Sequence, residues 1–252
     1  MHAMTRLRIA TESASAPIPT RGRRRTLTAA LVCLAVLSVA AAAPAATLRE
    51  LGMTSSTFPT PGCPSQCSVI ARVTGYQAQS GSARNPFAIP SSGRIVAFTI
   101  ALGKPDANQL KYFTQNFGGK PEVRIAVLKP VPHHKYLQLT AQSEIFDLSN
   151  YLGSTPTFAL ATSLKAPKGS LIALTTPTWA PAFATKRPST DGWRSFRTNC
   201  NNNTQVATHD RIGTTHTYSC LYRGARLLYS ATLIPNPTRT KTPTSGHTTT
   251  HH

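Results

Sequence analysis

The chain has 252 residues and carries 27 Lys and Arg against eight Asp and Glu, a formal net charge of +19 with neutral histidines. So few carboxylates leave little choice for a catalytic pair of acids. The basic residues form no clustered helix, and there is neither zinc-finger spacing nor an RNP-like aromatic motif, so the composition does not favour specific recognition of nucleic acid.

The first 45 residues have the pattern of a secretory signal peptide. Six arginines precede an uncharged, alanine-rich run from Thr26 to Ala43, which ends in the small-x-small pattern Ala43-Pro44-Ala45. We therefore predict that residues 1–45 are a signal peptide cleaved after Ala45, and that the mature protein is secreted or associated with the cell wall. The alternative is an uncleaved anchor, since the run is barely long enough to span a bilayer. No second apolar run of that length follows, so we expect no membrane span after cleavage.

Cleavage would leave 21 Lys and Arg against seven Asp and Glu, a net charge of +14. Such a surface favours salt-dependent association with polyanions, and for an exported protein the candidates are anionic wall polymers, lipid headgroups and extracellular DNA. The alternative is that the charge only keeps the protein soluble.

Four cysteines follow the leader: Cys63, Cys67, Cys200 and Cys220. An even number in an oxidising compartment predicts two disulfides, and three pairings are open. Short loop closure favours Cys63–Cys67 and Cys200–Cys220. A zinc site is the competing hypothesis, but no second closely spaced pair completes it.

Residues 46–66 lack periodicity and are expected to form a flexible lead-in, and residues 67–237 a single domain. Alternation of apolar and polar residues predicts short strands in that domain. They are expected at 69–73, 87–89, 95–102, 123–127, 137–141, 145–148, 158–164, 171–174, 217–222 and 227–233. The strand at 95–102 is apolar on both faces, which is typical of a central strand.

One short helix is predicted between strands, over residues 107–117. Asp106 is its expected N-cap, with Gln109 completing a capping box, and Gly118-Gly119 ends it. Leu110, Phe113 and Phe117 lie on one side at helical spacing. We expect this stripe to close one end of the core, and the alternative is that it lines a ligand groove.

Because the strands are short, separated by turn residues and not alternated with helices, the sequence predicts an all-β fold. We expect an antiparallel, jelly-roll-like β-sandwich with one inserted helix. Residues 238–252, rich in Thr, Pro and His, offer nothing to bury and are expected to be a disordered tail.

Three segments carry a resemblance to a known group of proteins. They are the turn Pro90–Gly93 with the strand after it, the strand Val123–Pro130, and the turn Pro167–Gly169 leading into a strand that ends at Leu174. This order, over roughly residues 85–180, is similar to that of exported bacterial β-sandwich proteins of unknown function from high-GC Gram-positive lineages. Ser170 stands where those proteins have an acid. The resemblance implies the fold and the compartment, and no activity.

Catalytic candidates are few. His209-Asp210 is the best acid–base candidate, although neighbours in an extended segment point to opposite faces. His216 joins His209 as a metal pair only if a hairpin brings them together, and Glu144 with Asp147 is the one candidate carboxylate pair. No nucleophile elbow, phosphate loop or zinc-protease motif is present. We therefore assign no catalytic residue, cofactor or metal.

Trp179 and Trp193 lie in segments rich in turn residues, where a ring can stack on a sugar. The alternative for both is packing over the end of the core. Together these observations favour a non-enzymatic binding module for an anionic or polysaccharide component of the cell envelope. A secreted hydrolase and a structural or protein-interaction domain are the other hypotheses.

Overall fold

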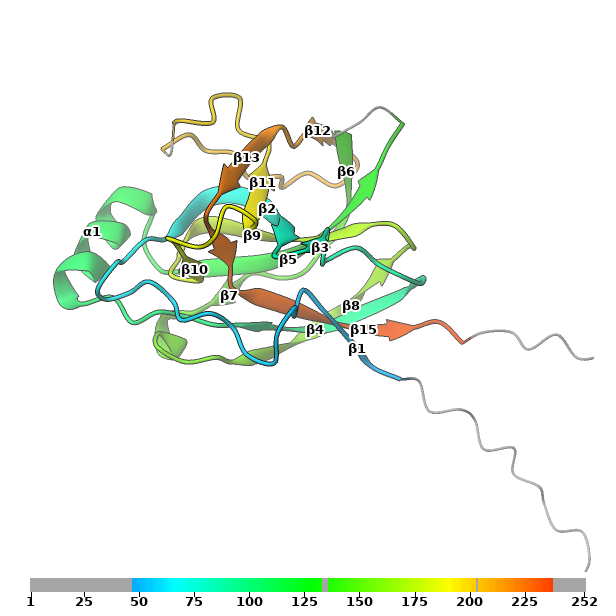
Figure 1. Ribbon diagram of the computed structural model, residues 1–252, viewed down its shortest axis with the longest axis horizontal. Coiled ribbons are helices and arrows are strands. Elements are labelled where there is room, and N and C mark those ends of the chain that lie inside the picture. Colours follow the sequence, from blue (N-terminus) through cyan, green and yellow to red (C-terminus); the bar gives the residue numbers. More distant parts are fainter. Residues whose placement is uncertain (1–46, 133–135, 203, 238–252) are drawn as a thin grey trace, which may run out of the picture. The chain divides into compact units, whose positions relative to one another are not determined.

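A computed structural model describes residues 47–132, 136–202 and 204–237. The predicted signal peptide and the predicted disordered tail lie outside the described residues. Within them the chain forms two layers of antiparallel strands, with a single α-helix at one end (Figure 1). The predicted all-β sandwich with one short inserted helix is confirmed.

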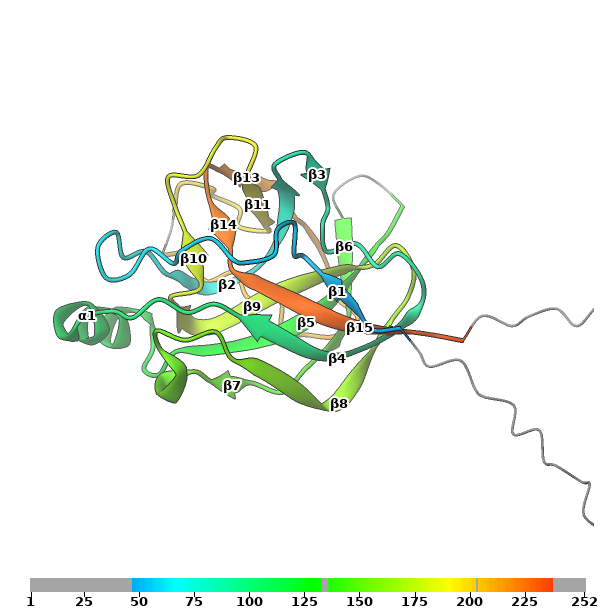
Figure 2. The same ribbon diagram turned by 60° about the horizontal axis from the view of Figure 1, so that its bottom comes forward.

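The smaller layer is a four-stranded sheet in the order β1-β15-β4-β8 (Figure 2). Its strands are β1 (Arg49–Leu51), β15 (Tyr229–Pro235), β4 (Gly93–Ile100) and β8 (Thr157–Ala166). β4 pairs with β15 on one side and β8 on the other, so the expected central strand is central.

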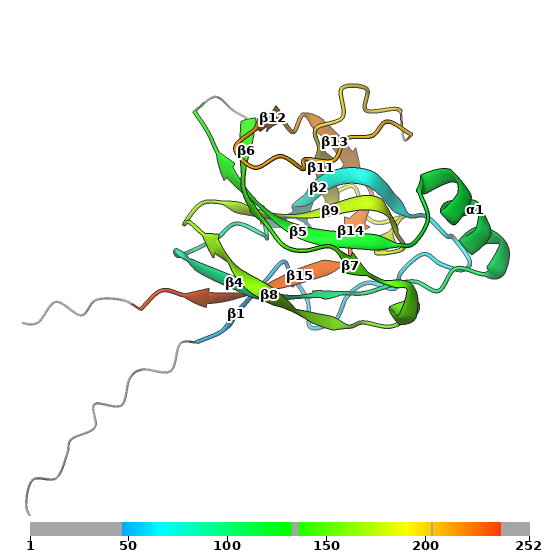
Figure 3. The ribbon, with the colours of Figure 1, turned by 180° about the vertical axis from the view of Figure 1, so that it is seen from behind.

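The larger layer follows the order β12-β6-β5-β9-β2-β11-β13 (Figure 3). Its strands are β12 (Thr215–Thr217), β6 (Tyr136–Gln142), β5 (Glu122–Pro130), β9 (Leu171–Ala180), β2 (Ile70–Ser80), β11 (Gly192–Ser195) and β13 (Cys220–Arg223). Two short strands extend it, β3 (Ala83–Arg84) beside β2 and β7 (Phe146–Asp147) beside β5. β10 (Phe183–Ala184) and β14 (Arg226–Leu227) form a separate pair.

The main core lies between the two layers, where alternate residues of facing strands interdigitate. It includes Ile95 and Phe98 of β4, Ile125 of β5, Ile172 of β9 and Leu233 of β15, all fully buried. Burial of each such side chain contributes roughly 1.5–3 kcal/mol. The larger layer is also covered on its outer face, where Tyr218 and the half-buried Phe196 pack on a second apolar cluster of β5, β6 and β9.

The helix α1 (Ala107–Phe117) has the predicted bounds and cap. The Gln109 amide donates to Asp106 Oδ1 at 2.9 Å, and the Asp106 amide donates to Gln109 Oε1 at 3.0 Å. Gly118 ends the helix with φ of 102°, a left-handed conformation that glycine adopts at low cost.

The expectation of a flexible lead-in at 46–66 is wrong for the part that the structure describes. Arg49–Leu51 forms β1 and pairs with β15, and the Gly62 amide donates to the Phe183 carbonyl at 3.0 Å. The segment shows no strand period because only three of its residues join a sheet and the rest is held by loop contacts. The domain therefore begins before residue 67.

Both disulfides have the expected local pairing, Cys63–Cys67 and Cys200–Cys220. With all four sulfurs in disulfides, the competing zinc hypothesis has no thiolate ligands left. A search of the described helices finds none with the length and apolar character needed to cross a membrane.

Strand β9 runs six residues further than predicted and contains Pro177. The register shifts by one between Ala71 and Val73 of β2, which face Trp179 and Thr176 of β9, so β9 carries an extra residue there. A bulge tolerates proline because the missing N–H is not needed for the ladder. Trp179 therefore lies in a central strand and not in a loop.

Candidate functional site

A cleft of about 370 Å³ lies between α1 and the β11–β13 end of the larger sheet. Six of the residues that line it are aromatic, and they come from four separate elements. They are Tyr112, Phe113, Phe117, Phe183, Trp193 and Tyr222. Such a concave, largely apolar site with few polar groups is the usual setting for a small ligand.

One wall of the cleft is the aromatic face of α1. Phe113 and Phe117, one helical turn apart, lie with ring centroids 6.1 Å apart, and Tyr112 is 5.7 Å from Phe113. Phe113 is buried, whereas 56% of Tyr112 is exposed. Of the predicted stripe, Phe113 packs on the sheet beside Trp179, and Phe113 and Phe117 also line the cleft, whereas Leu110 is exposed.

The opposite wall is a pair of stacked rings. Trp193 of β11 and Tyr222 of β13 face each other in register, with centroids 4.5 Å apart and planes 24° apart. Phe183 meets Trp193 edge-on at 6.0 Å. The indole Nε1 of Trp193 is buried and has no hydrogen-bond partner among the described residues. Trp193 therefore lines the cleft, but only 5% of it is exposed and it packs mainly on Tyr222 and Phe183, as the alternative of packing over the end of the core expects.

Arginine supplies the charge of the cleft. The guanidinium carbon of Arg197 lies 6.0 Å from the Tyr222 ring centroid, and Arg197 Nη2 donates to the Ala71 carbonyl at 3.2 Å. Arg72 does not line the cleft, but its guanidinium carbon lies 5.6 Å from the centroid of Phe117, which does. Among the described residues that line the cleft, none is a carboxylate. The cleft thus combines aromatic walls with positive charge.

Trp179, the other predicted stacking residue, is completely buried. Its ring packs at 5.2 Å from Phe113, and its Nε1 donates to the Gly119 carbonyl at 2.8 Å. No ring face is left for a ligand, so the expectation of an exposed platform at Trp179 is wrong. The reason is the continuation of β9 through the bulge at Pro177, and the tryptophan serves instead to hold α1 against the sheet.

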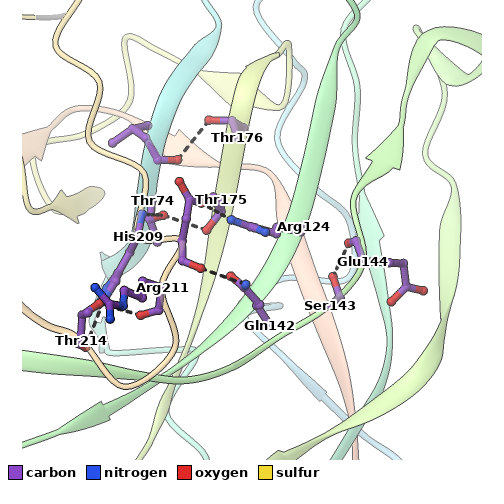
Figure 4. Close-up of polar contacts among 12 residues, drawn as sticks. Thr74, Arg124, Gln142, Ser143, Glu144, Thr175, Thr176, His209, Arg211 and Thr214 are labelled. Atoms are coloured by element: carbon purple, nitrogen blue, oxygen red, sulfur yellow. Dashed lines mark hydrogen bonds and ion pairs between the residues drawn. The ribbon is translucent and has the colours of Figure 1, made fainter.

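The acid–base candidate His209 lies in a buried polar cluster on the outer side of the larger sheet (Figure 4). Its backbone amide donates to Thr74 Oγ1 at 2.8 Å, and its ring contacts Tyr218 Oη at 3.0 Å through Nδ1 and Thr214 through Nε2. The Thr214 hydroxyl donates to the Arg211 carbonyl. Nε2 must then be the donor to Thr214, and Nδ1 accepts from the tyrosine.

Burial, and after it the nearby charge of His216, lowers the pKa of His209 to about 4. Asp210 forms an ion pair with Arg124 instead of orienting the imidazole, and its backbone carbonyl accepts from Gln142 Nε2 at 3.0 Å. A neutral histidine with both nitrogens engaged is a structural group, and the His209-Asp210 pair does not form an acid–base couple.

The structure does bring His216 to His209, with ring centroids 4.5 Å apart. The second ring stacks on Phe196 at 4.4 Å. Because both nitrogens of His209 already have partners, the pair offers no free ligand on that side. In the described parts of the chain, no group of three or more His, Cys, Asp or Glu is placed to hold a metal ion.

The candidate carboxylates Glu144 and Asp147 have separate partners. Glu144 Oε1 accepts from the Ala161 amide at 2.7 Å. Asp147 accepts from the Ser149 amide at 2.9 Å and from Lys120 Nζ at 3.0 Å, and the hydrogen bonds from Ser149, then that from Lys120, lower its pKa to about 2. Such a carboxyl is ionised at neutral pH and is unsuited to a general acid.

Among the residues that line the cleft, the sequence singles out Phe113, Phe117 and Trp193. It gives no indication that Phe183, Tyr222 and Arg197 lie beside them. The only signal for the cleft was the helical stripe, since its other walls are distant in sequence. Comparison of the chain with protein-family models, with curated proteins and with solved structures finds no match.

Proposed function

We propose that the chain is an exported, non-enzymatic binding module whose aromatic cleft takes a sugar unit of an anionic or polysaccharide envelope component. The observation that carries this proposal is a cleft lined by the exposed or half-buried rings of Tyr112, Phe117 and Tyr222. The buried Trp193 and Arg197 lie behind these rings. Aromatic rings present large apolar faces that suit the C–H faces of sugars, while arginine suits carboxylate or phosphate substituents.

The dimensions of the cleft support a small ligand or one unit of a polymer. Its volume of about 370 Å³ falls at the lower end of the usual range for ligand sites. It is open enough for Tyr112 to remain more than half exposed, as a site for one residue of a long chain requires.

Export and attraction to polyanions belong to the same proposal. Two disulfides among the described residues are typical of proteins from oxidising compartments. The leader pattern in residues 1–45 and the net charge of +14 after it support delivery to an anionic surface. The resemblance of residues 85–180 to exported bacterial sandwich proteins is part of this reading and adds no activity.

The test is retention of the mature protein on purified cell wall at low and high salt. We expect retention at low salt that weakens as salt rises, because charge attracts the polymer. Tyr112→Ala should weaken binding roughly 5- to 10-fold, the amount expected for one stacking contact. Tyr136→Ala is the matched control, since Tyr136 is exposed on β6 and does not line the cleft.

Two results would count against the proposal. Absence of retention at low salt contradicts binding to the wall altogether. Equal retention of the Tyr112 and Tyr136 variants contradicts the cleft as the site and leaves only a general attraction of charge.

A further inference from the structure

A second, polar pocket of about 350 Å³ lies apart from the aromatic cleft. It is formed by the chain after β1, the turn between β2 and β3, the segment before β11, and β14. Its walls carry two guanidinium groups and several hydroxyls. The guanidinium groups belong to Arg187 and Arg226, and hydroxyls come from Thr54, Ser80, Ser82 and Thr190.

Arg226 is the unusual residue of this pocket. Only 5% of it is exposed, and Arg226 Nη2 donates to the Gly52 carbonyl at 3.3 Å. Among the described residues no carboxylate forms an ion pair with it. Burial lowers the pKa of this guanidinium, and the charge of Arg187 lowers it too, against the opposing effect of Asp191. A buried cation without a contacting anion is costly, so an anion in the pocket would stabilise it.

Asp191, the acid of the pocket, is already engaged. Its Oδ1 accepts from the Gly81 amide at 2.9 Å, and its Oδ2 accepts from Arg187 Nε at 3.0 Å. Asp191 therefore forms its ion pair with Arg187 and acts on Arg226 only from a distance. With two arginines and one aspartate, the pocket keeps one net positive charge.

The hydroxyls supply further donors. Thr54 Oγ1 and Ser80 Oγ lie 2.9 Å apart and share one hydrogen bond, so whichever group donates leaves the other with a free proton. Ser82 and Thr190 are exposed at the mouth of the pocket. Several donors around one guanidinium match an anion with several oxygens better than they match a halide.

We propose that this pocket is a binding site for a phosphate group, in which Arg226 holds the charge and the surrounding hydroxyls hold the remaining oxygens. Phosphate suits the site because a guanidinium donates two parallel hydrogen bonds to it and hydroxyls reach its other oxygens. The site stands on residues that the aromatic cleft does not use, so it holds or fails independently of the function proposed above.

The experiment is an NMR titration of the protein with inorganic phosphate, against sodium chloride at equal ionic strength. We expect saturable shifts of the Gly81, Ser82 and Thr190 amides. Arg226→Met should weaken the apparent affinity at least 10-fold, while Arg94→Gln, which removes the same charge from the smaller sheet, should leave it within about 2-fold. Lack of saturable shifts at these amides, or equal affinity of the two variants, overturns the proposal.

Because Arg226 is buried, its substitution also perturbs the fold, and a second variant keeps the test decisive. Thr190→Val removes an exposed hydroxyl and should weaken phosphate binding roughly 2- to 5-fold with an unchanged circular dichroism spectrum. An unchanged affinity in this variant and a titration with acetate that matches phosphate would each contradict a phosphate site. Dimethyl phosphate in place of inorganic phosphate then separates an esterified ligand from the free ion, and saturable binding of either supports the site.

Discussion

Gly75 lies directly beneath Trp193. A Cβ atom at position 75 would come within 2.7 Å of the indole ring carbons and within 3.0 Å of the Arg194 carbonyl oxygen. Only glycine lets β2 approach β11 this closely, and this approach sets the depth at which the stacked rings of the cleft lie.

Gly75→Ala should therefore destabilise the protein by about 1–3 kcal/mol and displace the Trp193 ring. Urea unfolding and the fluorescence of the tryptophans measure the two effects. Gly192→Ala is the control, because the nearest atom to its Cβ is the end of the flexible Leu221 side chain at 3.3 Å. Equal stability of the two variants would contradict a tight contact at Gly75.

His209 makes the stability of the fold dependent on pH. Its pKa is about 4 in the folded protein, below its usual value of 6.5, so the unfolded chain binds the proton more readily between these values. Stability should be fully present above about pH 6.5 and fall as the pH decreases toward 4, by an amount on the order of 2 kcal/mol. Urea unfolding of the protein and of His209→Gln across this range checks it. The variant should show a shallower fall, and an identical pH profile in both proteins would be the contrary outcome.

The two disulfides should differ in their contribution to stability. Cys200–Cys220 spans 20 positions and Cys63–Cys67 spans four. Because a longer loop loses more freedom in the unfolded chain, replacing both cysteines of the longer bridge by serine should cost about 3 kcal/mol, and the same change in the shorter bridge should cost less. Thermal unfolding of the two double variants compares their losses of stability. A larger loss in the variant without Cys63–Cys67 would contradict the expectation.

Asp106 caps the N-terminus of α1, the helix that supplies one wall of the cleft. Asp106→Ala removes the acceptor of the Gln109 amide and should destabilise the protein by about 1 kcal/mol. Asp106→Asn retains an oxygen acceptor and should cost much less. Chemical denaturation separates the two variants, and the expectation fails if alanine and asparagine behave alike.

Local signals explain why parts of the fold follow from the sequence. The helix was predicted to the residue because Asp106, Gln109 and Gly118 act within their own turn. The strand predicted at 95–102 is found as β4, Gly93–Ile100, two residues earlier, because apolar residues on both faces identify a central strand better than they fix its ends. Both disulfides are also predicted correctly, because cysteines that are close in sequence lose little chain entropy when they pair.

Other parts depend on partners that are remote in sequence. The sequence does not predict β11, because four residues are too few to show an alternating pattern. Its strand conformation depends on pairing with β2 and β13, where Tyr76 and Tyr222 lie on either side of it. The cleft unites residues 112–117 with Trp193 and Tyr222 for the same reason. His209 is a catalytic candidate in the sequence because Asp210 follows it. In the structure its ring contacts Thr214 and Tyr218 instead.

The pairing of β1 with β15 brings Arg49 opposite Leu233, so the two ends of the described domain leave from the same edge. In Figure 1 this edge lies far from α1. A short linker between these ends, with a new opening in a surface loop, would give a circular permutant that preserves every strand pair. If the domain were tethered to a support through either end, α1 and the cleft beside it would face away from that support.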